Sequence, residues 1–200
     1  MKQIGLFFGS FNPIHVGHLI IANSMVNQTN MDEVWFVVSP QSPFKAKKSL
    51  LADHHRLALV MEAVEDNPKL KVSNIEFELP KPSYTINTLV HLEEKFSDYN
   101  FSLIMGEDNL RSFHKWKNYI QILDRVNLAV YPRAKVSSET HEDLAKIIEK
   151  IIMDRVTIYD VPVMDISASF IRDGIKSGKD MKYLLTEPVF KYITEMNFYR

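Results

Sequence analysis

Short runs of apolar, β-branched residues alternate with amphipathic stretches along almost the whole chain. Such runs predict buried strands, and apolar positions at three- and four-residue spacing predict helices that cover them. The expected strands are Ile4–Phe8, Val34–Val38, Lys71–Ser73 with an extension to Phe77, Phe101–Met105, Asn127–Tyr131 and Thr157–Asp160. The expected helices are Val16–Gln28, Asp53–Glu65 with Asp53 as N-cap, Ile86–Phe96, Tyr119–Asp124 and Glu139–Met153. This alternation predicts an α/β fold, a Rossmann-like doubly wound parallel sheet with helices on both faces.

The pattern changes after Asp160, where two helical segments follow without a strand between them. They are Ser167–Lys176, with Gly178 as the expected C′ residue, and Pro188–Met196, with Pro188 at the first helical position. No internal repeat or low-complexity segment is present. We therefore predict one domain over residues 1–200, with a Rossmann-like core over 1–160 and a small helical appendage over 161–200.

Composition narrows the class of protein. The chain has 200 residues, 46% of them hydrophobic and 24% charged, as expected for a globular domain with a sizeable core. Its formal net charge of -1 argues against nonspecific binding to nucleic acid or acidic membranes. The lack of cysteine excludes disulfides and thiolate metal sites and is consistent with a reducing compartment. Because the first apolar run is too short for a signal peptide and no later one approaches a membrane span, we expect a cytoplasmic enzyme. The oligomeric state stays open, with a homo-oligomer as one option.

The candidate chemistry begins where the first strand ends, in Gly9-Ser10-Phe11-Asn12-Pro13-Ile14-His15-Val16-Gly17-His18. Gly9 permits a sharp turn and close approach of a ligand to the backbone. The helix that follows offers free N–H groups and the positive end of its dipole to an anion. His15 and His18 are three residues apart at that end, so both can donate hydrogen bonds to a phosphate. The stretch therefore predicts a phosphate site, although it fits neither the G-x-G-x-x-G nor the P-loop spacing.

Other interpretations of this stretch are an ordinary strand, loop and helix with His18 facing solvent, and a histidine zinc site. The zinc site would use His15 and His18, or His54 and His55. It has little support because the chain has neither thiolates nor an H-E-x-x-H spacing.

Two later segments add to the phosphate site. Gly106-Glu107-Asp108-Asn109 follows the fourth strand, where Gly106 allows close approach of a ligand and Asp108 could accept hydrogen bonds from ribose hydroxyls. The same residues also suit a plain turn. In Ile166-Ser167-Ala168-Ser169-Phe170-Ile171-Arg172, Ser167 or Ser169 can cap a helix while Arg172 projects from its first turn. The alternative there is a capped surface helix with a solvated arginine.

The first and the last of these three segments, residues 9–18 and 166–172, resemble signatures of the nucleotidyltransferase superfamily. Residues 9–18 fill every position of the motif G-[ST]-F-[DN]-P-x-H-x-G-H, and residues 166–172 are similar to I-S-[SA]-[ST]-x-[IV]-R. Ser83-Tyr84-Thr85-Ile86-Asn87-Thr88-Leu89 is similar to the S-Y-T-x-[DN]-T-L segment of the bacterial nicotinate-nucleotide adenylyltransferases, which the chain resembles over nearly its whole length. It departs from the common pattern at Asn12, where many members have aspartate, at Ala168, where serine is frequent, and at Glu107, where a small residue is common.

The resemblance implies transfer of the adenylyl group of ATP to nicotinate mononucleotide, giving deamido-NAD and pyrophosphate in NAD biosynthesis. It implies Mg²⁺ as the ion that enters with ATP, and no metal site in the protein. The implied catalytic residues are His15, His18 and Arg172. The implied ATP contacts are Gly9, Ser10, Phe11, Lys45, Gly106, Asp108, Arg133, Ser167 and Ser169. Thr85 and Trp116 would hold the nicotinate, with Trp116 stacked on the pyridinium ring.

The reaction that the resemblance implies explains why no activated nucleophile is evident. The phosphate of the mononucleotide is already an anion, so it can attack the α-phosphorus of ATP without a general base, and catalysis becomes positioning and charge stabilisation. Two other functions stay open from the residues alone. One is a related cytidylyl- or adenylyltransferase with another acceptor, and the other is a non-catalytic nucleotide-binding module.

Overall fold

The structure is a computed structural model that describes residues 1–40, 50–132 and 153–200. Within these ranges a parallel sheet has the strand order β3-β2-β1-β4-β5-β6. Its strands are β1 (Lys2–Gly9), β2 (Glu33–Val38), β3 (Leu70–Ser73), β4 (Tyr99–Gly106), β5 (Asn127–Tyr131) and β6 (Val156–Ile158). This is the Rossmann order, in which the direction of winding reverses between β1 and β4. The predicted fold class is confirmed.

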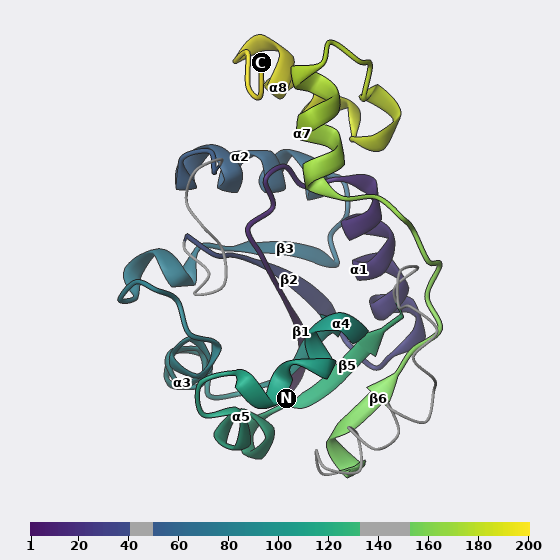
Figure 1. Cartoon of the computed structure of the whole chain (residues 1–200). Coiled ribbons are helices and arrows are strands. Elements are labelled where there is room, and N and C mark those ends of the chain that lie inside the picture. Colours follow the sequence, from purple (N-terminus) through teal and green to yellow (C-terminus); the bar gives the residue numbers. More distant parts are fainter. Residues whose placement is uncertain (41–49, 133–152) are drawn as a thin grey trace.

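Helices cover both faces of the sheet (Figure 1). One face carries α1 (Val16–Gln28) and α2 (Asp53–Val64), over which α7 (Ala168–Lys176) and α8 (Glu187–Glu195) lie. The other carries α3 (Thr85–Lys95), α4 (Glu107–Arg111) and α5 (Tyr119–Arg125). Short 3₁₀ helices are η2 (Ile75–Glu78), η3 (Phe113–Lys115), η4 (Met153–Arg155) and η5 (Lys182–Leu184).

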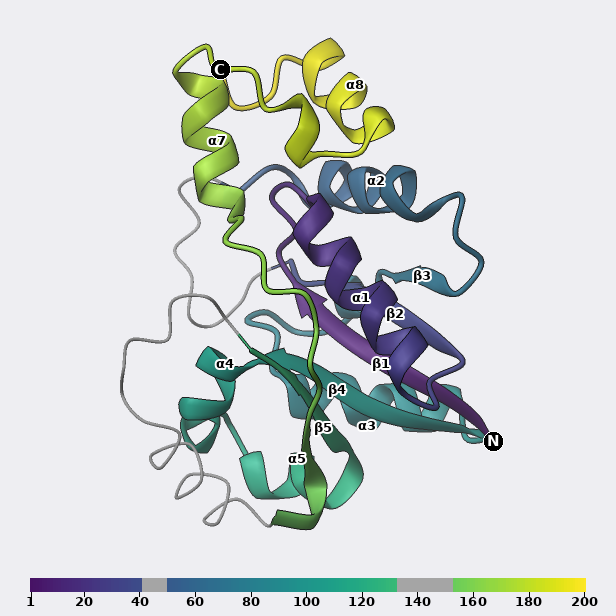
Figure 2. The same ribbon diagram turned by 90° about the vertical axis from the view of Figure 1, so that its right-hand side faces the viewer.

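Each face of the sheet has its own apolar cluster, because the central strands of a parallel sheet are buried on both sides. Phe36 packs with helix residues such as Leu59 on the α2 face, and Leu103 packs with Leu89 on the α3 face. Val189 of α8 is fully buried in the first cluster, so the C-terminal helices share the core of α1 and α2. Figure 2 shows the chain running from β6 past α1 to α7 and then on to α8 above α2.

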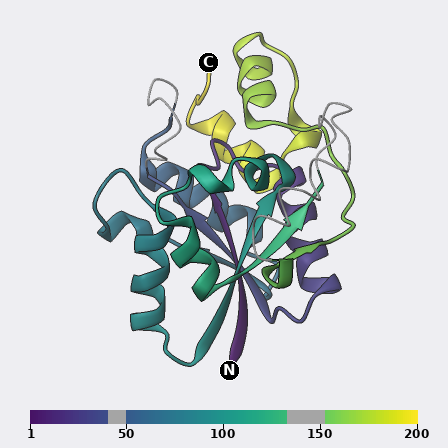
Figure 3. The ribbon, with the colours of Figure 1, turned by 60° about the horizontal axis from the view of Figure 1, so that its bottom comes forward.

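The N-terminus of β1 lies at the far end of the sheet from α8 and the C-terminus (Figure 3). Among the described residues, no helix is both long enough and apolar enough to cross a bilayer.

Most element boundaries agree with the sequence prediction within two residues, and α1 and β5 agree at both ends. Gly178 has φ of 71°, as its predicted place after α7 requires. The helix expected over Glu139–Met153 lies, apart from its last residue, outside the described residues.

Three local predictions were wrong. The extension of the third strand to Phe77 is instead η2, because the Glu76 carboxylate turns inward and accepts a hydrogen bond from Thr88 Oγ1 at 2.7 Å. Asp53 is the first helical residue and Ala52 the N-cap, because the Asp53 carboxylate pairs with Arg56 and Lys81. Pro188 is the second residue of α8 rather than the first.

Candidate active site

Two cavities that share part of their walls open at the carboxyl ends of β1 and β4. Their volumes are about 590 and 490 Å³, and we call them the first and the second cavity. The residues common to both walls are Phe8, Gly9, Ser10, Asn109 and Trp116. In a doubly wound sheet, ligands bind at the point where the strand order reverses, which is where these cavities lie.

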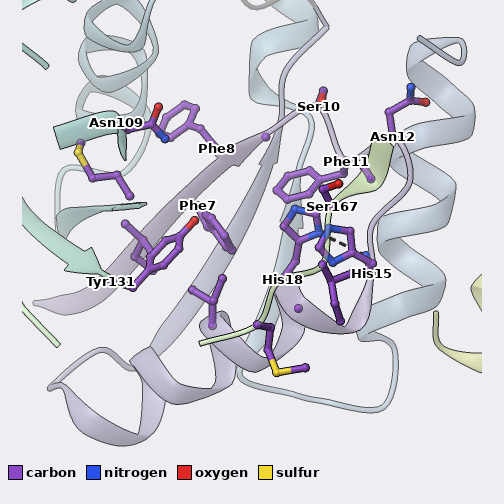
Figure 4. Close-up of a pocket in the computed structure, with 18 of the residues that line it drawn as sticks. Phe7, Phe8, Ser10, Phe11, Asn12, His15, His18, Asn109, Tyr131 and Ser167 are labelled. Atoms are coloured by element: carbon purple, nitrogen blue, oxygen red, sulfur yellow. Dashed lines mark hydrogen bonds between the residues drawn. The ribbon is translucent and has the colours of Figure 1, made fainter. Parts of the chain in front are cut away.

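The first cavity is lined by both of the segments that the sequence singles out for phosphate. Figure 4 shows His15 and His18 on one side of it, with Phe11 and Ser167 close by. Arg172 Nη1 donates to the carbonyl of Asn12 at 2.8 Å, although the two residues are 160 positions apart. Helix α7 therefore contacts the loop after β1 directly. Arg172 Nη2 also donates to Ser169 Oγ at 3.1 Å. The fold thus brings the two segments to one site.

A backbone hydrogen bond orients the His18 ring. The N–H of His15 donates to His18 Nδ1 at 3.3 Å, and a backbone N–H can only donate. Nδ1 of His18 therefore acts as the acceptor, which leaves Nε2 as the donor of the ring. The His15 and His18 rings are stacked with centroids 3.7 Å apart. The stack and the hydrogen bond together orient the His18 donor at the cavity.

Phe11 fixes the orientation of His18 from the other side. Its ring is 2% exposed and meets the His18 ring edge-on, with centroids 5.2 Å apart. The left-handed residue of the loop is Phe11, with φ of 43°, and not Gly9. A Cβ at position 9 would lie 2.7 Å from the Phe11 ring, so Gly9 is needed to make room for that ring. This differs from the sharp turn that the sequence suggests for Gly9.

The electrostatic character of the first cavity favours anions. The first turns of α1 and α7 border it, and Ser167 caps α7 by accepting from the N–H of Phe170 at 3.2 Å. Helix N-termini present N–H donors and a partial positive charge. Arg172 adds a full positive charge, and no carboxylate is among the lining residues that the structure describes.

The second cavity combines an aromatic wall with two lysines. Trp116 lies on this wall and packs against Phe113, with ring centroids 5.3 Å apart. Thr85, the first residue of α3, lies on the same wall. Lys117 Nζ is 4.3 Å from the centre of the Tyr84 ring, and Lys115 is a further lining residue. An aromatic acceptor that carries negative charge suits these walls.

Glu76 also lines the second cavity, although its side chain is nearly buried, with 2% exposure. Burial raises the pKa of its carboxyl group, and hydroxyl groups of Thr88, Ser39 and Ser83 oppose that rise. The group therefore stays protonated to a higher pH than an exposed glutamate.

Most of the predicted site residues line a cavity. His15, His18, Arg172, Phe11, Ser167 and Ser169 line the first, Thr85 lines the second, and Gly9, Ser10 and Trp116 line both. Gly106 and Asp108 line neither, because Met105 and Asn109 take the wall at the end of β4 and Asp108 faces solvent at the start of α4. Lys45 and Arg133 lie outside the described residues.

Three further residues at the site, Asn109, Glu76 and Arg56, are not predicted from the sequence. Asn109 lines both cavities and is the neighbour of Asp108, the residue that the sequence favours for a ribose contact. Arg56 is fully buried in α2 and donates to the carbonyls of Ser10 and Ser39, at 2.6 and 2.8 Å. An arginine in an amphipathic helix is usually solvated, so no local pattern points to this role.

A resident metal site has no support in the described part of the chain, where no three His, Cys, Asp or Glu side chains are grouped to hold an ion.

Comparison with known proteins agrees with this geometry. Residues 6–174 match the cytidylyltransferase-like family model. A protein of Flavobacterium psychrophilum named "Probable nicotinate-nucleotide adenylyltransferase" is 52% identical, and the alignment covers 99% of each chain. A protein of Christiangramia forsetii with the same name is 51% identical over 100% of this chain and 99% of its own. The chain belongs to the nicotinate-nucleotide adenylyltransferase family.

A solved structure has the same fold. The Plasmodium falciparum nicotinic acid mononucleotide adenylyltransferase, complexed with NaAD, superposes with a TM-score of 0.81 at 20% identity. The match covers 100% of this chain and 98% of that one. Membership of the nicotinate-nucleotide adenylyltransferase family thus rests on sequence, and the solved structure agrees in fold.

Proposed function

We infer that this enzyme transfers the adenylyl group of ATP to nicotinate mononucleotide, releasing pyrophosphate and forming nicotinic acid adenine dinucleotide for NAD biosynthesis. The observation that carries this conclusion is the joining of an anion-binding cavity to an aromatic, lysine-flanked cavity through shared walls. The first suits the phosphates of ATP. The second suits a negatively charged pyridine mononucleotide.

The reaction needs positioning more than proton transfer. The acceptor phosphate oxygen forms a new bond to the α-phosphorus of ATP as the bond from that phosphorus to the β-phosphate breaks, and pyrophosphate leaves with the electron pair. Since the acceptor is already an anion, no base has to remove a proton. We assign the donor groups of His15 and His18 to the α- and β-phosphate oxygens, where they offset the charge that builds up in the transition state.

Arg172 and the free N–H groups near Ser169 are assigned to the leaving pyrophosphate. The guanidinium group is already oriented by Asn12 and Ser169, so little ordering remains when the phosphates bind. The remaining assignments are Gly9, Ser10, Phe11 and Ser167 as walls of the ATP site, and Thr85 and Trp116 for the nicotinate. The ATP contacts of Lys45 and Arg133 stay predictions, and Gly106 and Asp108, which line neither cavity, are not assigned.

Magnesium belongs to the substrate in this proposal. The ion enters as magnesium-ATP, held by phosphate oxygens and water, since Mg²⁺ rarely uses an all-protein cage. The expected cytoplasmic location stays a prediction.

The test is the product formed from magnesium-ATP and nicotinate mononucleotide, identified by mass, for the wild type and two histidine variants. We expect His18→Ala to lower kcat by at least about a hundredfold, as for loss of one transition-state donor. The matched control is His54→Ala, because His54 is exposed on α2 and lines neither cavity. Turnover by His18→Ala within a few-fold of wild type would contradict the role assigned to His18.

A further inference from the structure

The C-terminal segment of the chain reaches back to the loop that follows β1. Tyr199, next to the last residue, places its hydroxyl 2.8 Å from Asn12 Oδ1. The two residues are 187 positions apart. Asn12 is 2% exposed and lines the first cavity, so the contact is made under the phosphate site rather than on the surface.

The direction of this hydrogen bond follows from a second contact. The backbone N–H of Leu51 lies 3.2 Å from the same Asn12 oxygen. A backbone N–H can only donate, so the amide atom facing it must be the oxygen, and the Tyr199 hydroxyl must donate to that oxygen as well. Burial raises the pKa of the Tyr199 phenol, against the opposing charges of Arg172 and Arg56, so the donor proton is retained.

The Asn12 side chain supplies the acceptor for both contacts. Its Oδ1 accepts from the Leu51 N–H and from the Tyr199 hydroxyl. Because the amide is neutral, it provides this acceptor without adding a negative charge to the first cavity.

Asn12 is held from three separate parts of the chain. Arg172 of α7 donates to its carbonyl oxygen, while Leu51 and Tyr199 donate to its side chain. Tyr199 itself has φ of 65°, a left-handed backbone that is unfavourable for a bulky residue and persists where surrounding contacts impose it.

We propose that Tyr199 is a positioning residue for adenylyl transfer, which acts through Asn12 to hold the loop after β1 in its phosphate-binding shape. Tyr199 lines neither cavity. The loop that Tyr199 holds leads to His15 and lines the first cavity. Loss of the Tyr199 hydroxyl should therefore lower turnover and leave the nicotinate site intact. The inference rests on the proposed function.

The test compares two tyrosines of the C-terminal appendage. Tyr199→Phe removes only the hydroxyl that reaches Asn12. Tyr192→Phe is the matched control, because the Tyr192 hydroxyl lies 3.1 Å from His55 Nδ1 on α2, and Tyr192 lines neither cavity. We expect Tyr199→Phe to lower kcat about tenfold, less than the roughly hundredfold cost of a full 1 Å misplacement, with KM for nicotinate mononucleotide within about twofold. Tyr192→Phe should stay within about twofold of wild type in both constants.

A double-mutant cycle separates positioning from general stabilisation. If Tyr199 acts through Asn12, Tyr199→Phe causes no further loss of kcat in an Asn12→Ala background, whereas independent effects would multiply. Melting temperatures of all variants show that each is folded at the assay temperature. The inference is overturned if Tyr199→Phe has the kcat of wild type, or if Tyr199→Phe lowers kcat by the same factor in the Asn12→Ala background as in the wild type. An inactive wild type would instead refute the proposed function.

Discussion

Arg56 offers the sharpest test of how the loops around the site are held. Its guanidinium is fully buried and donates to Leu51 O at 3.1 Å, Ser10 O at 2.6 Å and Ser39 O at 2.8 Å. It also pairs with Asp53 Oδ1 at 2.7 Å. Ser10 lines both cavities and Ser39 lines the second, so this one side chain ties the walls of the site to α2.

Arg56→Lys keeps the charge but loses the fork of donors. The lysine ammonium is a single point with three N–H groups, so it cannot serve the five acceptors around the planar guanidinium, which include the Pro40 carbonyl at 3.5 Å. Hydrogen bonds to charged groups contribute about 1.5–3 kcal/mol each, and at least one is lost while others are weakened. We expect the free energy of unfolding to fall by about 3 kcal/mol, equivalent to a melting temperature lower by about 6–12 °C in a chain of this size.

Urea unfolding of wild type and variant measures this difference. The matched control is Arg125→Lys, because Arg125 pairs with Glu93 on the surface, where both side chains are about one-third exposed. Such pairs contribute about 0.2–1 kcal/mol, so this variant should unfold close to wild type. If Arg56→Lys lowers the free energy of unfolding by less than about 1 kcal/mol, or by no more than Arg125→Lys does, the Arg56 guanidinium does not hold these loops.

Two further predictions concern the second cavity. Trp116→Ala should raise KM for nicotinate mononucleotide about tenfold, since a cation–π contact contributes about 1–2 kcal/mol. Trp116→Phe keeps an aromatic ring and should keep most of the affinity. Equal KM values for the two variants would contradict stacking of Trp116 on the pyridinium ring. Glu76→Gln should gain stability over wild type as pH rises above the ordinary glutamate value of 4.5, because the raised pKa of Glu76 makes ionisation costly in the folded state alone. Urea midpoints of both proteins across that range measure the gap, and a gap that does not change with pH would argue against a buried carboxyl with a raised pKa.

The sequence predicted the parts of this fold that depend on local pattern. Apolar runs marked all six strands of the described sheet, and the helix over Val16–Gln28 was placed at both ends. The two phosphate segments were found because each combines a helix start with donor side chains. The sequence alone does not show that Arg172 donates to the Asn12 carbonyl, since that contact depends on how α7 packs over α1 and α2.

Prediction failed where a side chain found a distant partner. Glu76 looked like one position of an alternating strand, but its bond to Thr88 of α3 turns the backbone into a 3₁₀ helix. Asp53 was predicted as a helix N-cap, but its carboxylate forms ion pairs with Lys81 and Arg56 instead. No local pattern marks Arg56, because its carbonyl partners come from the loop after β1 and from the connection between β2 and α2, which only the fold brings together. In each case the deciding partner is far away in the sequence or in a loop whose path is set by the fold.

The decisive assay is pyrophosphate release by the purified protein with magnesium-ATP, with nicotinate mononucleotide and nicotinamide mononucleotide compared as acceptors at equal concentration. We predict rapid release with the acid, because the second cavity carries Lys115 and Lys117 beside the aromatic wall. No release with nicotinate mononucleotide, in protein that still binds ATP, would contradict adenylyl transfer to this acceptor.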